Sequence, residues 1–445
     1  MKRKLSEELN LWLKEKTHKP LILRGARQTG KTYIVRQLAE TSGRQLIELN
    51  FERNPEYGEF FDTNKPAIIL QNLELMLGVK IDFEKSILFL DEIQACAFIL
   101  SKLRWFYEDC PSLPVIAAGS LLEFALDEYE DSMPVGRVTY RYLHPFSFTE
   151  FLWAMEEERL ASHLLTVRKD LQLPKVLHEK YLEYYRQYIL IGGMPEAVKK
   201  WKEKSDVREC IRLQKDLLTS FQDDFNKYRN RVPAEVLRKT MLSIPAQLGG
   251  KFVYNTVDRD QRQPVIKKAV ELLEKAGLCK RVYATSGNGV PLGAEKNDRI
   301  FKNIFLDSGL AMNVLGIRPV NAVQLNDILW ANNGAMAEQI CGQLMLSLHS
   351  HDDDELFYWQ QSGSGTGEID YLAQENDHAL PIEVKAGKSG SMKSLHAFME
   401  KKKLTSAVRF DLNPPSIQNV DVKTTQGKET RYTLLSLPLY MVEFL

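Results

Sequence analysis

Three short and almost entirely apolar runs stand out near the start of the chain. They read PLILRG, SILFLDEIQ and LPVIAAGS, and polar or glycine positions bound each of them. Continuous apolar runs of this length are typical of strands that are buried on both faces of a sheet. After the first run, YIVRQLAE places Ile34, Val35 and Leu38 on one face of a helix. The pattern predicts an α/β domain with a parallel sheet.

The spacing of apolar residues becomes helical between about residues 150 and 245, where charges of both signs are frequent. Farther on, RQPVIKKAVELLEKAG predicts a helix that starts near Pro264 and stops at Gly277, and the β-rich LCKRVYAT follows. A helix followed by such a strand suits a winged helix. Four side chains would then face a DNA groove: Arg262, Gln263, Lys267 and Lys268. The alternative is a module that packs against its neighbours and keeps its lysines solvated.

The last part of the chain combines one helix with three strands. NNGAMAEQICGQLMLSLHS has helical spacing, and ELFYWQQ, GEIDYLAQ and LPIEVKAG are strand-like runs separated by polar loops. The whole pattern predicts an α/β chain with three domains. They are an α/β domain over 1–200, a helical and winged-helix-like domain over 201–330, and a second α/β domain over 331–445.

Composition adds few constraints to this prediction. The chain has 445 residues, enough for two or three domains, and its 59 basic residues balance 59 acidic ones. Net charge therefore indicates neither nucleic acid nor membrane as a partner, although a local basic face stays open. The cysteines are scattered without a CxxC pair, which indicates reduced thiols in a cytoplasmic protein. No apolar run reaches the roughly 18 residues of a membrane span, so no membrane partner is expected.

Residues 25–32 read GARQTGKT, a full match to the phosphate-binding pattern GxxxxGK[ST]. The loop lies between a predicted strand and a predicted helix, where backbone N–H groups can point at phosphate oxygens. Lys31 would reach the β and γ phosphates, and the Thr32 hydroxyl would ligate Mg²⁺. The expected nucleotide contacts are Gly25, Ala26, Arg27, Gln28, Thr29, Gly30, Lys31 and Thr32.

A Mg·ATP site also needs a carboxylate at the end of a neighbouring strand. Asp91 and Glu92 directly follow the apolar run at 87–90. We expect Asp91 to hold Mg²⁺ through a water, and Glu92 to orient or deprotonate the attacking water. The guanine-specific NKxD pattern is missing, because NKPA at 64–67 lacks the aspartate. ATP is therefore predicted rather than GTP.

Three further residues are candidates for contact with the γ-phosphate. Ser120 ends the third apolar run and suits a sensor of the γ-phosphate, although a helix N-cap is an equal alternative. Arg137 and Arg141 lie in GRVTYRYLHPFSFTEF. Either suits a phosphate contact within the chain or an arginine finger across a subunit interface, and solvated arginines are the alternative.

Acidic residues and a lysine form a second candidate site near the C-terminus. Glu383 and Lys385 are two apart in a predicted strand, so their side chains point to the same face. Asp370 on the neighbouring strand and Glu338 on the preceding helix can join them. Converging carboxylates bind Mg²⁺ or Mn²⁺, with Asp370 and Glu383 as the expected ligands, and a lysine stabilises departing phosphate charge. This is the chemistry of metal-assisted phosphodiester cleavage, and a folded remnant that binds no metal is an open alternative to an active nuclease.

Nine motifs spread over nearly the whole chain resemble those of one bacterial family. They are GARQTGKT, LFLDEIQ, AAGS, GRVTYRYLHPFSFTEF, IGGMPEAV, FLDSGLAMNVLG, NNGAMAEQI, GEIDYL and PIEVKAG. The family consists of AAA-type ATPases whose C-terminal domain of unknown function is similar to PD-(D/E)xK nucleases. The resemblance implies a P-loop NTPase sheet of the AAA+/ASCE type, a winged-helix middle and a restriction-endonuclease-like C-terminal domain. It implies functional roles for Lys31, Thr32, Asp91, Glu92, Glu338, Asp370, Glu383 and Lys385.

Together these patterns predict an ATP-binding protein that acts as a Mg²⁺-dependent ATPase and a nucleotide-driven switch. DNA, a second copy of the chain and a partner protein are the candidate partners. Two alternatives stay open. One is an ATP-bound regulatory scaffold with an inactive nuclease-like domain, and the other is an ATP-gated DNA nuclease.

Overall fold

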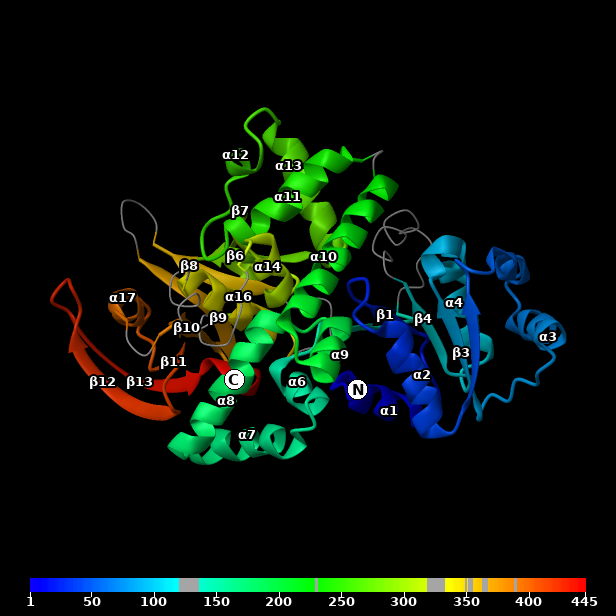
Figure 1. Cartoon of the computed structure of the whole chain (residues 1–445), viewed down its shortest axis with the longest axis horizontal. Coiled ribbons are helices and arrows are strands. Elements are labelled where there is room, and N and C mark those ends of the chain that lie inside the picture. The colour runs from blue at the N-terminus through cyan, green and yellow to red at the C-terminus, as the bar shows by residue number, and fades with distance from the viewer. Residues whose placement is uncertain are drawn as a thin grey trace. The chain divides into compact units, whose positions relative to one another are not determined.

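The structure is a computed structural model of the full chain (Figure 1). It describes residues 1–119, 136–228, 231–317, 333–348, 350, 355–361, 367–387 and 390–445. Contacts between residues divide the chain into two compact units. The first unit comprises Met1–His144 with two short later segments, and the second contains the rest of the chain.

The first unit is built on a five-stranded parallel sheet with the order β2-β3-β4-β1-β5. Its strands are β1 (Leu21–Arg24), β2 (Gln45–Asn50), β3 (Ser86–Asp91), β4 (Val115–Ala118) and β5 (Thr139–Tyr142). The three apolar runs of the sequence are β1, β3 and β4, and every residue of β3 is buried. Strand β4 pairs with both β1 and β3 and therefore lies between them. The predicted P-loop type of α/β sheet is confirmed.

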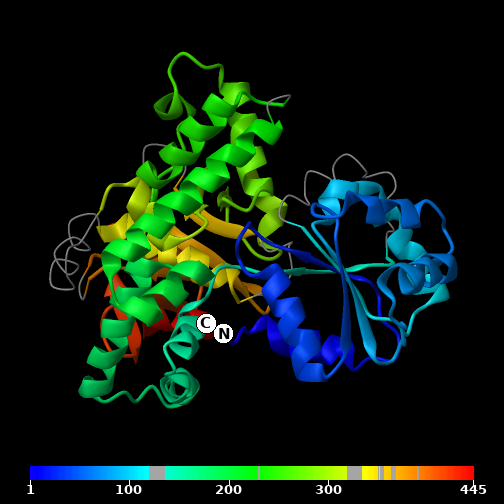
Figure 2. The same cartoon turned by 45° about the vertical axis from the view of Figure 1, so that its right-hand side comes forward.

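Helices cover both faces of this sheet (Figure 2). On one face, α1 (Leu5–Leu13) and α2 (Lys31–Ser42) bury their apolar sides, and for α2 this agrees with the predicted helix face. The other face carries η1 (Pro55–Phe61), α3 (Pro66–Leu77), η2 (Ile93–Lys102) and α4 (Leu103–Asp109). Each fully buried leucine, isoleucine or phenylalanine contributes about 1.5–3 kcal/mol. The two cores therefore fix the ends of β1 and β3, where the candidate nucleotide residues lie.

The second unit begins with helices. They are α6 (Phe148–Ala154), α7 (Glu158–Asp170), α8 (Lys175–Ile191), α9 (Pro195–Lys204), α10 (Val207–Asp224), η4 (Phe225–Tyr228), α11 (Ala234–Ala246), α12 (Tyr254–Val257) and α13 (Gln263–Lys275). Helix α8 ends at Ile191, and Gly192 caps its C-terminus with a φ of 72°. Helix α13 buries Ile266, Ala269 and Leu273 on one face. The four residues that we expected on its exposed side are indeed exposed, namely Arg262, Gln263, Lys267 and Lys268.

An eight-stranded mixed sheet follows, with the order β12-β13-β11-β10-β9-β8-β6-β7. Its strands are β6 (Cys279–Thr285), β7 (Lys296–Phe305), β8 (Leu356–Gln360), β9 (Glu368–Glu375), β10 (His378–Val384), β11 (Ser406–Asp411), β12 (Ser416–Lys423) and β13 (Glu429–Pro438). The accompanying helices are η5 (Leu292–Glu295), α14 (Ser308–Val314), α16 (Asn333–Leu346), α17 (Lys393–Lys402) and η6 (Leu439–Phe444). Strand β6, which follows α13, pairs with β7 and β8 and so belongs to this sheet. The division into 1–200, 201–330 and 331–445 stays a prediction.

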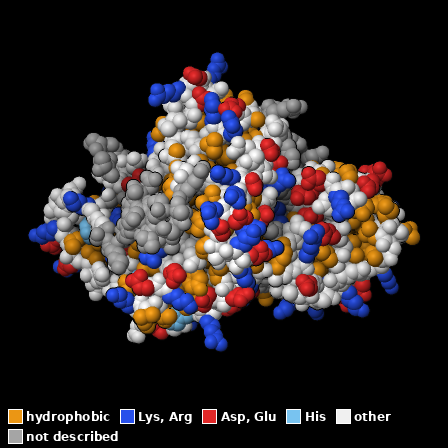
Figure 3. All heavy atoms as spheres, in the orientation of Figure 1, with side chains coloured by type: hydrophobic (Ala, Val, Ile, Leu, Met, Phe, Trp, Pro, Cys, Tyr) orange, Lys and Arg blue, Asp and Glu red, His pale blue; other side chains and the backbone are white. Residues whose placement is uncertain are grey.

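The surface carries charges of both signs. On the face shown in Figure 3, basic and acidic side chains are interspersed over the described residues. This mixture agrees with the equal numbers of basic and acidic residues in the chain. Within the described ranges, no helix has both the length and the apolar character that crossing a membrane requires.

Candidate nucleotide and metal sites

The glycine loop connects the end of β1 to the start of α2, as the sequence predicts. Gly25 has a φ of 136°, and a Cβ there would collide with the carbonyl oxygen of Leu143. Gly30, with a φ of 97°, directly precedes the first turn of α2. Both positions require glycine because an L side chain rarely adopts such a φ. The N-terminal segment supports the loop, since the Arg3 guanidinium donates to the carbonyl of Thr29 at 2.9 Å.

Lys31 folds back onto the loop. Its Nζ atom donates to the carbonyl oxygens of Gly25 and Ala26, each at 2.9 Å. Only 8% of the residue is exposed. Burial lowers the pKa of the Lys31 ammonium to about 8, although the carboxylates of Glu92 and Asp91 oppose that shift. Phosphate oxygens are better partners for a buried ammonium than carbonyls, so this geometry suits a phosphate ligand.

Thr32 and Asp91 face each other across the same end of the sheet. The Thr32 hydroxyl lies 3.3 Å from Oδ1 and 3.2 Å from Oδ2 of Asp91. The Asn50 amide donates to Oδ2 of Asp91 at 3.3 Å from the neighbouring strand. Burial and then the charge of Glu92 raise the pKa of Asp91 to about 6. The hydroxyl and carboxylate oxygens at one point form a donor set that suits Mg²⁺.

Glu92 has a left-handed backbone, with a φ of 50° and a ψ of 43°. Such a conformation is uncommon for a residue other than glycine and often marks a functional position. The Glu92 carboxylate accepts a hydrogen bond from the side-chain amide of Gln94 at 2.6 Å. Gln94 is therefore a functional candidate that the sequence analysis did not identify.

The remaining nucleotide candidates have different outcomes. Ser120 lies outside the described residues. Arg137 forms an ion pair with Glu108 at 3.1 Å and lies over the ring of Tyr107. Arg141 forms an ion pair with Glu8 at 2.8 Å. In this state both arginines are paired with carboxylates of their own unit, and a phosphate role for either stays a prediction.

The second unit holds a compact group of carboxylates. Glu338 on α16 and Asp370 on β9 come together, as the sequence predicts, and Glu368 on β9 joins them. One oxygen of each lies within 4.8 Å of an oxygen of the others. Glu368 was not among the residues predicted for this site. The signal was present, because residues two apart on a strand point to the same face.

Lys302 on β7 lies inside this carboxylate group. Its Nζ atom is 2.9 Å from Oε2 of Glu338 and also forms an ion pair with Glu368. The Lys302 side chain is only 4% exposed. Burial favours the neutral amine, but the nearby carboxylates outweigh it and raise the pKa of Lys302 above its usual value. Burial raises the pKa of Glu338 to about 8, and the charge of Lys302 opposes that rise.

Glu383 and Lys385 form an ion pair with each other, as their spacing predicts. Oδ2 of Asp370 accepts the backbone N–H of Val384 at 2.7 Å, which places Asp370 beside this strand. Burial and then the charge of Asp370 raise the pKa of Glu383 to about 7. Glu383 therefore shares the electrostatic environment of Asp370. Among the described residues, however, the group whose oxygens lie within 4.8 Å of one another contains Glu368 rather than Glu383.

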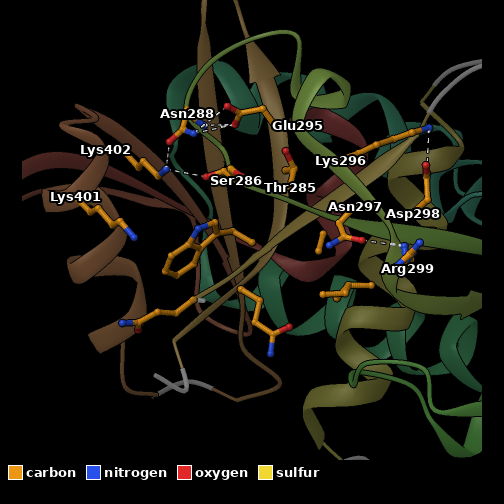
Figure 4. Close-up of a pocket in the computed structure, with 15 residues that line it drawn as sticks. Thr285, Ser286, Asn288, Glu295, Lys296, Asn297, Asp298, Arg299, Lys401 and Lys402 are labelled. Atoms are coloured by element: carbon orange, nitrogen blue, oxygen red, sulfur yellow. Dashed lines mark hydrogen bonds and ion pairs between the residues drawn. The ribbon is translucent and has the colours of Figure 1, made fainter. Parts of the chain in front are cut away.

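A separate polar cavity of about 690 Å³ lies near η5, β7, β8 and the end of α17 (Figure 4). Its lining includes Lys296, Arg299, Lys401 and Lys402. Lys402 donates to the carbonyl of Ser286 at 2.7 Å and contacts the side chain of Asn288. The lining contains none of the site residues that the sequence predicts.

Comparison with protein-family models assigns three regions of the chain. Residues 17–152 match the model described as AAA domain. Residues 182–321 match a Domain of unknown function (DUF8612), and residues 333–440 match a Domain of unknown function (DUF4143). The first unit is therefore an AAA-type P-loop domain, which agrees with its sheet order and glycine loop. The chain therefore combines an N-terminal region similar to AAA domains with a C-terminal region similar to DUF4143 domains. No curated protein is a significant match.

Several solved structures have weak similarity to the chain. The Walker-type ATPase of Pyrococcus abyssi is 16% identical, with a TM-score of 0.44, over 70% of this chain and 95% of that one. RuvB of Thermotoga maritima is 16% identical, with a TM-score of 0.30, over 62% of this chain and 88% of that one. The ORC2 protein of Aeropyrum pernix is 11% identical, with a TM-score of 0.33, over 74% and 94%. Similarity this low establishes no activity.

Proposed function

We propose that the chain is a Mg²⁺-dependent ATPase that uses ATP binding and hydrolysis as a conformational switch. The convergence of Lys31, Thr32 and Asp91 at the ends of β1 and β3 carries this proposal. Lysine, hydroxyl and carboxylate are the groups that P-loop ATPases use to hold nucleotide and Mg²⁺. Their positions on the first turn of α2 and at the end of β3, rather than on separate loops, support a preformed site.

Each residue of this site has a distinct role. Lys31 would exchange the carbonyls of Gly25 and Ala26 for phosphate oxygens, which bind an ammonium more strongly. Thr32 and Asp91 would hold Mg²⁺, which neutralises phosphate charge when it is bound. Glu92 would orient or deprotonate the attacking water once it leaves Gln94. Lys31 would alternate between loop carbonyls and phosphate oxygens, and Glu92 between Gln94 and water. This alternation would make the site a switch.

Replacing Glu92 by glutamine tests hydrolysis separately from binding. We expect Glu92→Gln to bind ATP with nearly unchanged affinity, because the glutamine keeps the size of the side chain. Its rate of phosphate release should fall at least about 100-fold, since a general base contributes that much or more. An unchanged release rate would instead favour the alternative, an ATP-bound regulatory scaffold. Equilibrium binding and phosphate release are measured on the same preparations.

We further propose that the carboxylate group of the second unit is a nuclease-like metal site. Glu338, Glu368 and Asp370 offer only oxygen ligands, which suit Mg²⁺ or Mn²⁺. A further observation supports a cation there. Oε2 of Glu383 is buried, and it has no hydrogen-bond partner among the described residues. Lys385 beside Glu383 would stabilise the departing phosphate charge.

DNA is the substrate that this site and the exposed face of α13 would share. The test is Mn²⁺-dependent cleavage of plasmid and branched DNA by the full chain, with and without ATP. Asp370→Ala and Lys385→Ala should abolish cleavage, whereas Lys393→Ala, at the start of α17, should not. Cleavage that requires ATP would support the ATP-gated nuclease. No cleavage of any DNA would favour an inactive nuclease-like domain, with a second copy of the chain or a partner protein as the target.

A further inference from the structure

The carboxylate group of the second unit already contains a cation. Lys302 reaches it from β7, and its ammonium contacts Glu338 from α16 and Glu368 from β9. The ring of Tyr358 lies 5.0 Å from the Lys302 Nζ atom and supplies a third favourable contact for the positive charge. The three contacting residues come from two strands and one helix, so folding itself places the ammonium there.

The ammonium takes the place that a divalent ion would need. Mg²⁺ binds oxygen at about 2.0–2.1 Å in octahedral geometry, so its ligand oxygens lie about 3–4 Å apart. The oxygens of Glu338, Glu368 and Asp370 lie within 4.8 Å of one another, close to that spacing. A metal at their centre would compete with the Lys302 ammonium for the carboxylates of Glu338 and Glu368. Two cations at one point also repel each other strongly in a buried site.

We propose that Lys302 occupies the cation position of the Glu338, Glu368 and Asp370 group, so that a divalent metal binds there only when Lys302 leaves. This inference rests on the proposed metal site and adds the residue that controls its occupancy. The protein then has two forms of the site. In the closed form the ammonium neutralises the carboxylates, and in the open form the metal does.

Manganese binding to the full chain without nucleotide tests this proposal. The variant Lys302→Met removes the charge but keeps a long apolar side chain. We expect it to gain one Mn²⁺ site at least about tenfold tighter than any such site in the wild-type chain. The added site should disappear in the double variant Lys302→Met with Asp370→Asn. Free Mn²⁺ is followed by electron paramagnetic resonance, and binding heat by calorimetry.

A matched control comes from the same strand. Lys296 also lies on β7 and forms an ion pair with Glu355, away from the carboxylate group. Lys296→Met should bind Mn²⁺ like the wild-type chain. Circular dichroism and thermal unfolding establish whether each variant is folded. If Lys302→Met does not fold without metal, Lys302→Gln carries the same test, because its amide can still donate to Glu338.

The results separate failure of the inference from failure of the metal site. Equal Mn²⁺ affinity of the wild-type chain and Lys302→Met, at a site that Asp370→Asn removes, would keep the metal site and overturn the role of Lys302. No site dependent on Asp370 in either protein would overturn the proposed metal site and the inference with it. A Mn²⁺-dependent rise of the unfolding temperature in Lys302→Met alone would support both.

Discussion

The hydroxyl of Thr32 lies 3.2 Å from Oδ2 of Asp91, so the first turn of α2 and the end of β3 present oxygen atoms to one point. The parallel register explains this meeting. Strand β4 lies between β1 and β3, and each of these strands ends at the same edge of the sheet. The metal-binding part of the nucleotide site therefore comes from a helix and a strand and does not depend on a mobile loop.

Replacing Asp91 should separate metal binding from nucleotide binding. Mg²⁺ should raise the ATP affinity of the wild-type chain. We expect this increase to be at least about tenfold smaller in Asp91→Asn, because the ligand charge is gone. ATP affinity without Mg²⁺ should be unchanged or slightly higher, since a negative charge near the phosphates has been removed. Asp109→Asn, at the exposed end of α4, is the control. Equal Mg²⁺ dependence in Asp91→Asn and the wild-type chain would exclude Asp91 as a metal ligand.

ATP affinity should depend on pH through Lys31. Burial lowers the pKa of its ammonium to about 8 in the free protein, and bound phosphate would restore the usual, higher value. Between about pH 7 and pH 8 the ammonium is already mostly present, so Lys31 should make affinity nearly independent of pH there. Above pH 8 binding must take up a proton, and affinity should fall by up to about tenfold for each pH unit. Terminal phosphates ionise near pH 6, outside this window.

Calorimetry in buffers of different ionisation enthalpy measures the proton directly. Uptake should be close to zero at pH 7 and should rise toward one proton by about pH 9. In Lys31→Arg the guanidinium stays charged throughout this range. Any residual ATP binding of that variant should therefore lack the pH dependence. Proton uptake by Lys31→Arg equal to that of the wild-type chain would assign the titration to another group.

The nucleotide site was accessible to sequence reasoning because its parts are local. GARQTGKT specifies the loop within one contiguous segment, and the apolar run at 87–90 places Asp91 at a strand end. Asn50 was not accessible. It meets Asp91 through the register of β2 against β3, and register between distant strands is not visible in a single sequence. Arg3 supports the loop from 26 residues upstream, and this contact is likewise not visible in a single sequence.

The carboxylate group shows the same limit more clearly. Glu338 and Asp370 were expected to meet, because acidic residues on a helix and a strand suggest a shared site. Lys302 was not expected, because its place follows from β7 pairing with β6, β6 with β8, and β8 with β9. The sequence also does not indicate which residue a charged side chain will pair with. Arginine is a residue type that suits phosphate, yet Arg137 and Arg141 are each paired with a glutamate in this state.

Gln94 should restrain Glu92 in the nucleotide-free protein. The hydrogen bond between them, at 2.6 Å, holds the carboxylate that is proposed to act on water. We expect Gln94→Ala to raise the basal rate of phosphate release about threefold to tenfold, which corresponds to the roughly 1 kcal/mol of one hydrogen bond. ATP affinity should change less than about twofold, because Gln94 is not expected to contact phosphate. Gln71→Ala, on the exposed side of α3, is the matched control.

The opposite result for Gln94→Ala would also be informative. A lower rate would mean that Gln94 aims Glu92 at the water and does not restrain it. Single-turnover measurements are needed here, because steady-state rates can report product release instead of chemistry.

The stability of the second unit should depend on Gly192. Its φ is 72°, and a Cβ there would collide with the carboxylate of Asp307. That carboxylate also accepts the backbone N–H groups of Gly193 and Leu310, so it cannot move without losing both. We expect Gly192→Ala to lower the free energy of unfolding by about 2–5 kcal/mol, from backbone strain and overpacking together.

Gly316 provides the control for the strain alone. Its φ is also 72°, but among the described residues no atom beyond its two chain neighbours lies within 4 Å of the position that a Cβ would take. Gly316→Ala should therefore cost only the conformational strain, about 1 kcal/mol. Urea unfolding followed by fluorescence compares the midpoints of the two variants with that of the wild-type chain. If both variants shift the midpoint equally, contact with Asp307 contributes nothing, and Gly192 is required only for its backbone angle.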